Sequence, residues 1–187
     1  MRYGRRVVLA YPDPPLTDSV IRLRPRRLDD TDCVRQAATD PSISAGTTVP
    51  TVYTIEKGHS YIQRQWSRIE NAEGVSLVVA DAKTDEPLGQ LWIAIRPQPG
   101  VAGLGYWIVP DARQSGLATR AVRLASDWAL GPLAMARLEA WVTPENELSQ
   151  RVPTATGFQL EGHLRSFLQL DQQRSDALVF SRIPTDD

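Results

Sequence analysis

The order of the expected elements predicts an α+β fold with a mixed, mostly antiparallel central sheet flanked by helices. Three strand patterns follow one another between residues 75 and 109 with only turn residues between them, which is typical of an antiparallel meander. An amphipathic helix at residues 117–130 then separates two further strand patterns, and this connection is long enough to make those two strands parallel neighbours. Two long strands at the end of the chain complete the expected sheet.

Length and composition indicate one domain. The chain has 187 residues, of which 42% are hydrophobic, so it can bury a core without metals or disulfides. We assign residues 20–184 to the domain, residues 1–19 to a proline-rich lead-in and residues 185–187 to a C-terminal tail.

Charge and cysteine content exclude several classes of protein. The 21 basic and 22 acidic residues give a net charge of −1, without the cationic excess that binds nucleic acid or membrane surfaces. The single cysteine, Cys33, cannot form an internal disulfide, and no cysteine or histidine cluster has metal-ligand spacing. No apolar run approaches the roughly 18 residues that span a bilayer, and the stretch after Arg5 and Arg6 is too short for a signal peptide. We therefore expect a cytoplasmic protein with no metal, no nucleic-acid partner and no membrane contact.

The first half of the chain supplies an edge strand and two helices. Residues 20–24 alternate at period two and stop at a proline, as an edge strand does, and residues 7–10 form a weaker strand pattern. Asp29 or Asp30 can cap a short helix that runs to residue 38 and ends at Asp40 and Pro41. The second helix, at residues 55–72, has an apolar face formed by Tyr61, Ile62, Trp66 and Ile69.

Glycine and proline turns bound the elements of the second half. The meander strands cover residues 75–80, 88–95 and 104–109. The helix at residues 117–130 has one apolar stripe and ends at a Gly-Pro pair. Beyond it we expect a strand at residues 138–142, a helix at residues 146–156, and strands at residues 158–170 and 176–183.

The turn before the helix at residues 117–130 has the features of an anion-binding site. It reads Arg113-Gln114-Ser115-Gly116-Leu117-Ala118-Thr119. A glycine and a small residue let the backbone approach a ligand, while unpaired N–H groups and the positive helix end favour a phosphate or pyrophosphate. The lysine of a P-loop and the three glycines of a dinucleotide motif are both missing. Alone, the pattern Arg-x-x-Gly-x-Ala also fits an ordinary tight turn.

Other short motifs stand in a fixed order around this turn. They are Ile21-Arg22-Leu23-Arg24-Pro25, Gly105-Tyr106-Trp107-Ile108, Ala118-Thr119-Arg120-Ala121-Val122, Asn146-x-x-Ser149-x-Arg151-Val152, Gly157-Phe158-x-x-Glu161-Gly162-x-Leu164-Arg165, and Asp176 before the last strand. In their joint order and spacing, residues 20–183 resemble the GNAT family of acyl-CoA-dependent N-acetyltransferases, most of all its ribosomal-protein (RimJ/RimL) branch.

This resemblance implies a GNAT-type sheet in which a splayed parallel strand pair holds an acyl-CoA, with acetyl-CoA as co-substrate. It places the pyrophosphate on the backbone amides of the turn and pairs the pantetheine arm with the preceding strand, as an extra strand would pair. The cofactor-binding residues that it implies are Trp107, Ile108, Val109, Arg113, Gln114, Ser115, Gly116, Leu117, Ala118, Thr119, Asn146 and Ser149.

Acetyl transfer to an amine needs a neutral amine, a hydrogen-bond donor for the developing oxyanion and an acid for the departing thiolate. A backbone amide near Ile108 can supply the oxyanion donor. Ser149 is the candidate catalytic acid at sulfur, although close packing of a small residue explains it equally well. Asn146 likewise fits a plain helix cap.

Two positions depart from the pattern of many GNAT enzymes. Pro153 stands seven residues after Asn146, where many carry a tyrosine that acts as the catalytic acid. A proline cannot donate a proton and should bend the helix. Gly103 stands where many carry a glutamate, so the resemblance implies no general base. Local candidates are Glu139, His59 and His163, and the last is expected to share a strand face with Glu161 and Arg165. The ordinary pKa of histidine, about 6.5, suits proton removal, but a solvent-facing strand residue explains His163 more simply.

We interpret the chain as an acetyl-CoA-dependent N-acetyltransferase that acts on a primary amine. The acceptor could be a protein N-terminus, an amino acid or a small amine, and a homodimer is also open. The rival interpretation, favoured by Gly103 and Pro153, is an acyl-CoA-binding protein with little or no catalytic activity. Turnover with any amine acceptor distinguishes the two.

Overall fold

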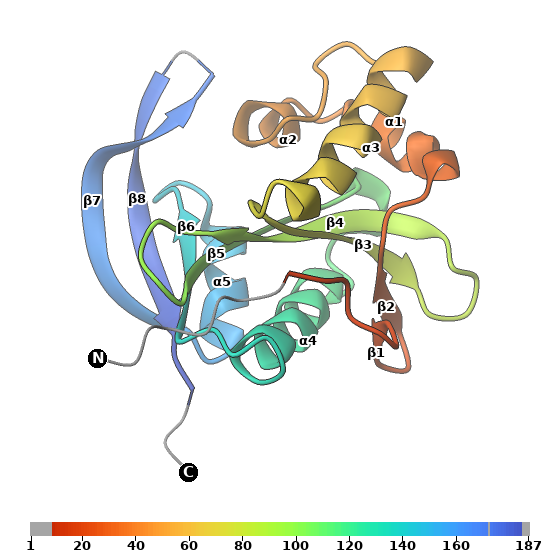
Figure 1. Ribbon diagram of the computed structural model, residues 1–187. Coiled ribbons are helices and arrows are strands. Elements are labelled where there is room, and N and C mark those ends of the chain that lie inside the picture. Colours follow the sequence, from red (N-terminus) through yellow and green to blue (C-terminus); the bar gives the residue numbers. More distant parts are fainter. Residues whose placement is uncertain (1–8, 172, 185–187) are drawn as a thin grey trace.

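A mixed eight-stranded sheet forms the centre of the protein (Figure 1). The computed structural model describes residues 9–171 and 173–184. The strands are β1 (Leu16–Thr17), β2 (Ile21–Arg24), β3 (Gly74–Asp81), β4 (Pro87–Ile95), β5 (Val101–Ile108), β6 (Arg137–Val142), β7 (Gln159–Leu170) and β8 (Gln173–Arg182). They lie in the order β1-β2-β3-β4-β5-β6-β8-β7, and within the described residues only β5 and β6 are parallel neighbours. The predicted α+β fold with a mostly antiparallel sheet and one parallel strand pair is confirmed.

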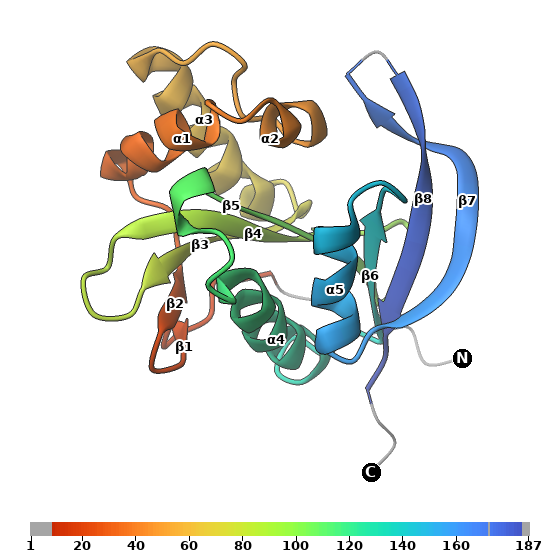
Figure 2. The same cartoon turned by 180° about the vertical axis from the view of Figure 1, so that it is seen from behind.

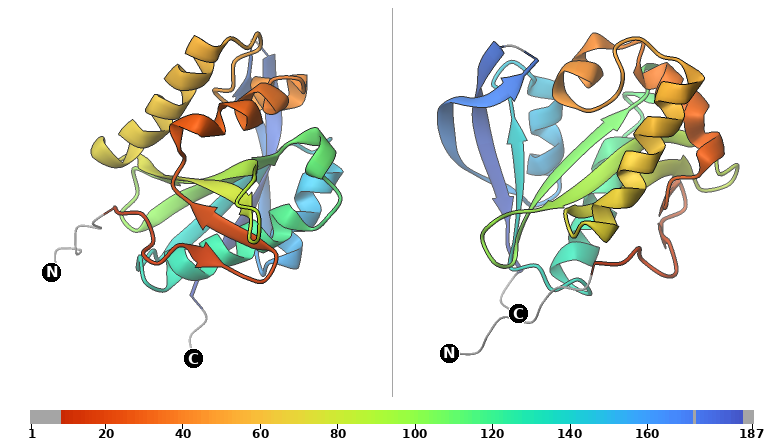
Figure 3. Two further views of the ribbon diagram at one scale, coloured as in Figure 1. Left: turned by 90° about the vertical axis from the view of Figure 1, so that its right-hand side faces the viewer. Right: turned by 45° about the horizontal axis from the view of Figure 1, so that its top comes forward.

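Helices cover both faces of this sheet. They are α1 (Thr31–Ala37), α2 (Pro41–Gly46), α3 (Ile55–Glu70), α4 (Leu117–Leu130) and α5 (Glu147–Ala155), with short 3-10 turns at Leu28–Asp30 and Pro110–Ala112. The first three lie on one face (Figure 1), and α4 and α5 lie on the other (Figure 2). Figure 3 shows the sheet between the two layers. Because it is covered on both sides, β3 is buried along all but its last residue.

The two layers enclose separate apolar cores. One core joins α4 to the sheet and contains Leu104, Ile108 and Leu138. The other lies beneath α1 and α3 and contains Tyr61 and Trp107. Neighbouring residues of β5 therefore contribute to different cores, as the alternation of side chains along a strand requires.

Two elements depart from the sequence-based expectation. Helix α2 was not expected, because Asp40 and Pro41 were interpreted only as a helix end; the Asp40 carboxylate also accepts a hydrogen bond from the Ser42 amide and so begins a new helix. Strand β1 has two residues, too few for a visible pattern, and extends the sheet into the stretch assigned to the lead-in. Of the weak strand pattern at residues 7–10, residues 9 and 10 form no strand, and residues 7 and 8 lie outside the described residues.

Several strand ends also differ from the expected positions. Strand β5 begins at Val101, three residues earlier than predicted, because Gly100 adopts a φ of +73° and the Arg96 amide donates to the Val101 carbonyl at 2.9 Å. Strand β8 begins at Gln173 and pairs with β7 along nearly its whole length. The register of this hairpin shifts twice, and the hairpin curves until its tip reaches the level of α2 (Figure 1).

Candidate active site

The parallel strands β5 and β6 separate soon after they begin. Their pairing covers only Val101 with Arg137, Ala102 with Leu138 and Gly103 with Glu139. Beyond Gly103, β5 remains paired to β4 on one side, while β6 remains paired to β8. The splayed parallel pair implied by the resemblance is therefore present, and its closed end lies at Gly103 and Glu139.

The backbone of β5 presents hydrogen-bonding groups to this opening. The Val109 amide donates to the Leu88 carbonyl at 2.9 Å and so points toward β4. Successive amides of a strand point to opposite edges, which directs the Ile108 amide to the opening. The amides of Trp107 and Val109, on either side of it, both point toward β4. Of these three residues expected to bind the cofactor, Ile108 is the one whose amide faces the opening.

The turn that precedes α4 has the geometry expected of an anion site. Gly116 adopts the left-handed φ of +75°, and no atom lies within 4 Å of a Cβ built on it. No side chain caps α4, so the first N–H groups of this helix, at residues 117–119, have no partner among the described residues. These donors and the positive helix end fit the pyrophosphate of coenzyme A.

The side chains of the turn have structural tasks. Arg113 forms an ion pair with Asp40 at 2.6 Å and donates from Nε to the Ile108 carbonyl at 3.0 Å. The Ser115 hydroxyl donates to the Ala112 carbonyl at 2.5 Å. The turn is thus fixed to both α2 and β5. The Arg113 amide donates to the Pro110 carbonyl at 3.3 Å, whereas the amides of residues 114–119 have no partner among the described residues and can meet a ligand.

Helix α5 brings Ser149 to β5 from the α4 side. The Asn146 side chain accepts a hydrogen bond from the Ser149 amide at 3.0 Å, so Asn146 is a helix cap. Pro153 lies within α5 and has no N–H to donate to the Ser149 carbonyl four residues earlier. Burial raises the pKa of the Tyr106 phenol, and the Ser149 hydroxyl opposes that rise. The two hydroxyl groups are therefore neighbours.

Tyr106 is a candidate that the sequence did not single out. Its hydroxyl is buried and has no direct hydrogen-bond partner among the described residues. Its raised pKa keeps the phenol protonated at neutral pH. The alternation within the Gly105-Tyr106-Trp107 motif could have placed Tyr106 on the face of Leu104, but the approach of Ser149 on α5 is a tertiary feature that residue order does not show.

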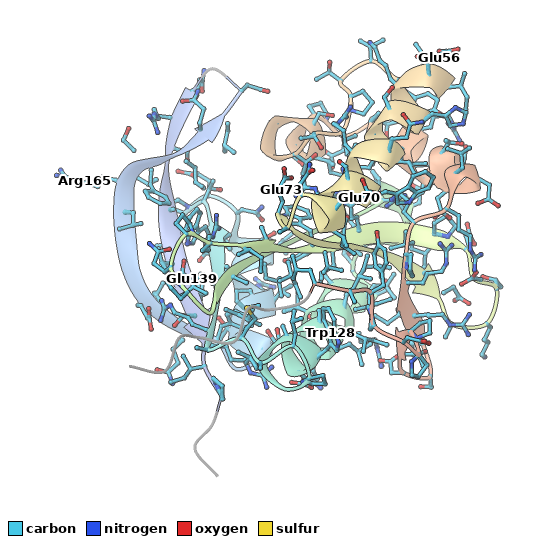
Figure 4. All side chains as sticks on the ribbon, viewed as in Figure 1. Glu56, Glu70, Glu73, Trp128, Glu139 and Arg165 are labelled. Atoms are coloured by element: carbon cyan, nitrogen blue, oxygen red, sulfur yellow. The ribbon has the colours of Figure 1, made fainter. Side chains whose placement is uncertain are left out.

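A pocket of about 430 Å³ lies beside the closed end of the opening, on the α3 side of the sheet. It is lined by Arg96, Pro97, Gln98, Val101, Arg137, Glu139, Trp141 and Phe167. Glu139 lies at the β6 side of the sheet near the β4–β5 turn (Figure 4). Its carboxylate pairs with Arg137 Nε at 2.8 Å.

The other base candidates are separated from one another. Glu161 pairs with Arg137 and accepts from the Ser181 hydroxyl at 2.5 Å, and these bonds lower its pKa to about 2. His163 bonds to Asp176 at 2.7 Å. The expectation that Glu161 and His163 share a face is wrong, because the register shift between residues 160 and 162 inserts an extra residue. Arg165 points away from the body of the molecule (Figure 4).

Across residues 9–171 and 173–184, no three histidine, cysteine, aspartate or glutamate side chains gather as metal ligands would. Cys33 is buried, and this burial raises the pKa of its thiol to about 11. Over the same residues, no helix combines the length and apolar character that crossing a bilayer demands.

Comparison with known proteins gives one consistent result. Residues 21–159 match the family model described as an acetyltransferase (GNAT) domain. The chain is 31% identical over 137 residues to the Bacillus subtilis (strain 168) protein named Probable N-acetyltransferase YjcK, a match that covers 72% of this chain and 76% of that protein.

Solved structures share the fold at lower identity. RimL, the ribosomal L7/L12 α-N-protein acetyltransferase solved with coenzyme A, superposes with a TM-score of 0.79 at 18% identity, over 92% of this chain and 98% of that one. Mycobacterium smegmatis RimJ superposes with a TM-score of 0.75 at 24% identity, over 93% of this chain and 90% of that one. The microcin C7 self-immunity acetyltransferase MccE, solved with acetyl-CoA and AMP, superposes with a TM-score of 0.77 at 20% identity, over 91% of this chain and 99% of that one.

Proposed function

The chain belongs to the GNAT acetyltransferase family and is an acyltransferase that uses acetyl-CoA, and from this premise we propose that it transfers the acetyl group to a primary amine. The single observation that carries the proposal is the opening between β5 and β6, with an uncapped helix N-terminus at one end and a pocket at the other. A donor and an acceptor can approach this opening from opposite faces of the sheet.

Donor binding is proposed for the turn and for the free edge of β5. The amides of residues 114–119 would hold the pyrophosphate, with Gly116 leaving space for it, whereas the Arg113 amide already donates to the Pro110 carbonyl at 3.3 Å. The pantetheine arm would lie along the opening beside Ile108 and reach α5 near Asn146 and Ser149. Bound acetyl-CoA supplies an activated acetyl thioester that a neutral amine can attack.

Two groups of this chain would serve the transfer itself. The Ile108 amide, which faces the opening, would donate a hydrogen bond to the thioester oxygen as negative charge develops there. The Ser149 hydroxyl would give its proton to the sulfur as the carbon–sulfur bond breaks. Tyr106, protonated and adjacent, would then return a proton to Ser149 and regain its own from solvent before the next turnover. The proton lost by the amine would leave through the pocket that contains Glu139.

Thiol release from acetyl-CoA tests the proposal. The purified protein is incubated with acetyl-CoA and a panel of amino acids, small amines and peptides with free N-termini, and the acetylated product is identified by mass. We expect thiol release that depends on an amine and yields equal amounts of thiol and acetylated amine. Calorimetry with acetyl-CoA alone serves as the control for folding and donor binding. Tight donor binding without turnover across the panel would contradict the proposal and favour an acyl-CoA-binding protein.

Cytoplasmic location and a homodimer stay predictions. Light scattering of the purified chain checks the second, with a mass near 20.8 kDa indicating a monomer.

A further inference from the structure

Arg96 lies flat across the sheet at the floor of the pocket. It follows β4 directly, and a Cβ built on Gly103 would lie 2.3 Å from its Nη2, so the glycine leaves the space that the guanidinium fills. The guanidinium carbon is 3.7 Å from the centroid of the Trp141 ring. That ring meets Phe167 edge-on, with 4.7 Å between the ring centroids. Arg96 is thus held as an oriented cation between a glycine and an aromatic wall.

The Arg96 guanidinium forms no hydrogen bond with the part of the chain that the structure describes. Its Nε is buried without a partner, and no carboxylate of the described residues forms an ion pair with it. Glu139 lines the same pocket but directs its carboxylate to Arg137 at 2.8 Å. Burial lowers the pKa of Arg96, and Glu139 opposes this only through its charge. A half-buried cation with free donors favours an incoming anion, and a planar guanidinium matches a carboxylate best.

The pocket lies where an acetyl acceptor has to be. Glu139 pairs with Gly103 in the last register pair before β5 and β6 separate, and Trp141 follows on the same face two residues later. Leu138 and Ala140, between them, belong to the core on the α4 side. A molecule in the pocket therefore borders the closed end of the opening from the face opposite α4 and α5.

We propose that this pocket binds an α-amino acid as the acetyl acceptor, with its carboxylate on Arg96, its amine toward Glu139 and an apolar side chain against Trp141 and Phe167. The inference rests on the proposed function and narrows its primary amine to one class. A volume of about 430 Å³ suits a single amino acid, since small-molecule pockets begin at about 300 Å³. The opposite charges of Arg96 and Glu139 match the two ends of a zwitterion.

Calorimetry on the protein saturated with coenzyme A tests this directly. The probes are L-leucine, L-leucinamide and 3-methylbutylamine, with L-phenylalanine and its amide as a second pair. We expect each amino acid to bind about 10- to 100-fold more tightly than its amide or the amine, because only the amino acid offers the carboxylate. This arm uses the wild-type chain and needs no variant.

Substitution of Arg96 locates the effect. Arg96→Gln should remove the preference for the amino acid over its amide, and Arg96→Lys should retain part of it. Arg165→Gln removes an equal charge from an exposed position on β7 that points away, and it should leave the preference unchanged. Urea unfolding confirms that each variant is folded. If Arg96→Gln does not fold, Arg96→Lys and the wild-type comparison of amino acid with amide still test the inference.

Rates separate this inference from the proposed function. The ratio of kcat/KM for leucine to that for leucinamide should fall about 10- to 100-fold in Arg96→Gln, and comparing this ratio between proteins cancels the different basicities of the two amines. Equal binding of leucine and leucinamide by the wild type would overturn the inference, even if peptides or amides are acetylated. Leucine binding that depends on Arg96, without turnover of any amine, would instead overturn the proposed function alone.

Discussion

The two glycines of β5 that face α3 should respond differently to alanine. A Cβ would lie 2.3 Å from Nη2 and 2.7 Å from Cζ of Arg96 at Gly103, and 2.3 Å from Cζ2 of Trp92 at Gly105. Ordinary carbon contacts are about 3.5–4.0 Å, so the neighbour has to move by more than about 1 Å in both variants. Arg96 can swing into the pocket at the cost of its stacking on Trp141, which is worth about 0.5–2 kcal/mol. Trp92 is a larger, partly buried ring that packs against the core beneath α3, so overpacking there should cost about 1–3 kcal/mol.

Urea unfolding followed by tryptophan fluorescence measures the difference. We expect Gly103→Ala to lower the free energy of unfolding by about 1 kcal/mol and Gly105→Ala to lower it by about 3 kcal/mol, with unchanged m-values. Thermal midpoints should fall by roughly 2–4 °C for each kcal/mol in a domain of this size. If Gly103→Ala destabilises as much as Gly105→Ala, the Arg96 guanidinium is a fixed part of the core and the reasoning that makes it available to a ligand fails.

Four other substitutions test separate parts of the molecule. Gly116→Val should weaken acetyl-CoA binding at least about tenfold by calorimetry, because its side chain would occupy the space at the start of α4, and unchanged affinity would place the pyrophosphate elsewhere. Ser149→Ala should lower kcat about 100-fold at saturating acetyl-CoA without changing donor affinity, whereas a wild-type kcat would remove it from the mechanism. Asp30→Asn breaks a buried ion pair and should cost roughly 3–5 kcal/mol in urea unfolding, and a loss below about 1 kcal/mol would contradict this. Arg137 lowers the pKa of Glu161 from 4.5 to about 2, so the stability it adds is complete above pH 4.5 and is lost as the pH falls toward 2. Since the Glu161 side chain is 44% exposed, the contribution should stay below about 1 kcal/mol, and in Glu161→Gln the free energy of unfolding measured with urea should fall by that much less between pH 4.5 and pH 2.

The parts of the fold that are local in sequence could be predicted. Helix α4 has the expected bounds because its apolar stripe and its terminal Gly-Pro pair are both readable from neighbouring residues. The left-handed φ of Gly116 and the capping role of Asn146 follow from residue type for the same reason. Strand β1 could not be found, because two residues carry no pattern and its pairing partner lies on another strand.

The candidate site was only half visible in the sequence. The donor side is a continuous segment, so a glycine turn before a helix indicates it directly. The acceptor side depends on contacts between different strands of the sheet, and the order of residues in the sequence does not show which strands come into contact. The sequence indicates at Gly103 only a missing base, whereas its absent side chain makes room for Arg96, which directly follows the neighbouring strand β4. The sequence does not single out Tyr106, because the neighbouring Ser149 lies on a helix more than 40 residues later.

The alternation of β5 explains why one strand can serve both substrates. Tyr106 and Ile108 face α4 and α5, the side of the anion-binding turn, whereas Gly103 and Gly105 face α3 and the pocket. The opening beside this strand is the place where a group bound on one face can meet a group bound on the other, since the paired part of the sheet separates the two layers everywhere else. Glycine on the acceptor face is then more than missing bulk. Gly103 lets Arg96 lie against the backbone, close to the point where β5 and β6 part. The positive charge that selects the acceptor therefore stands there because Gly103 has no side chain.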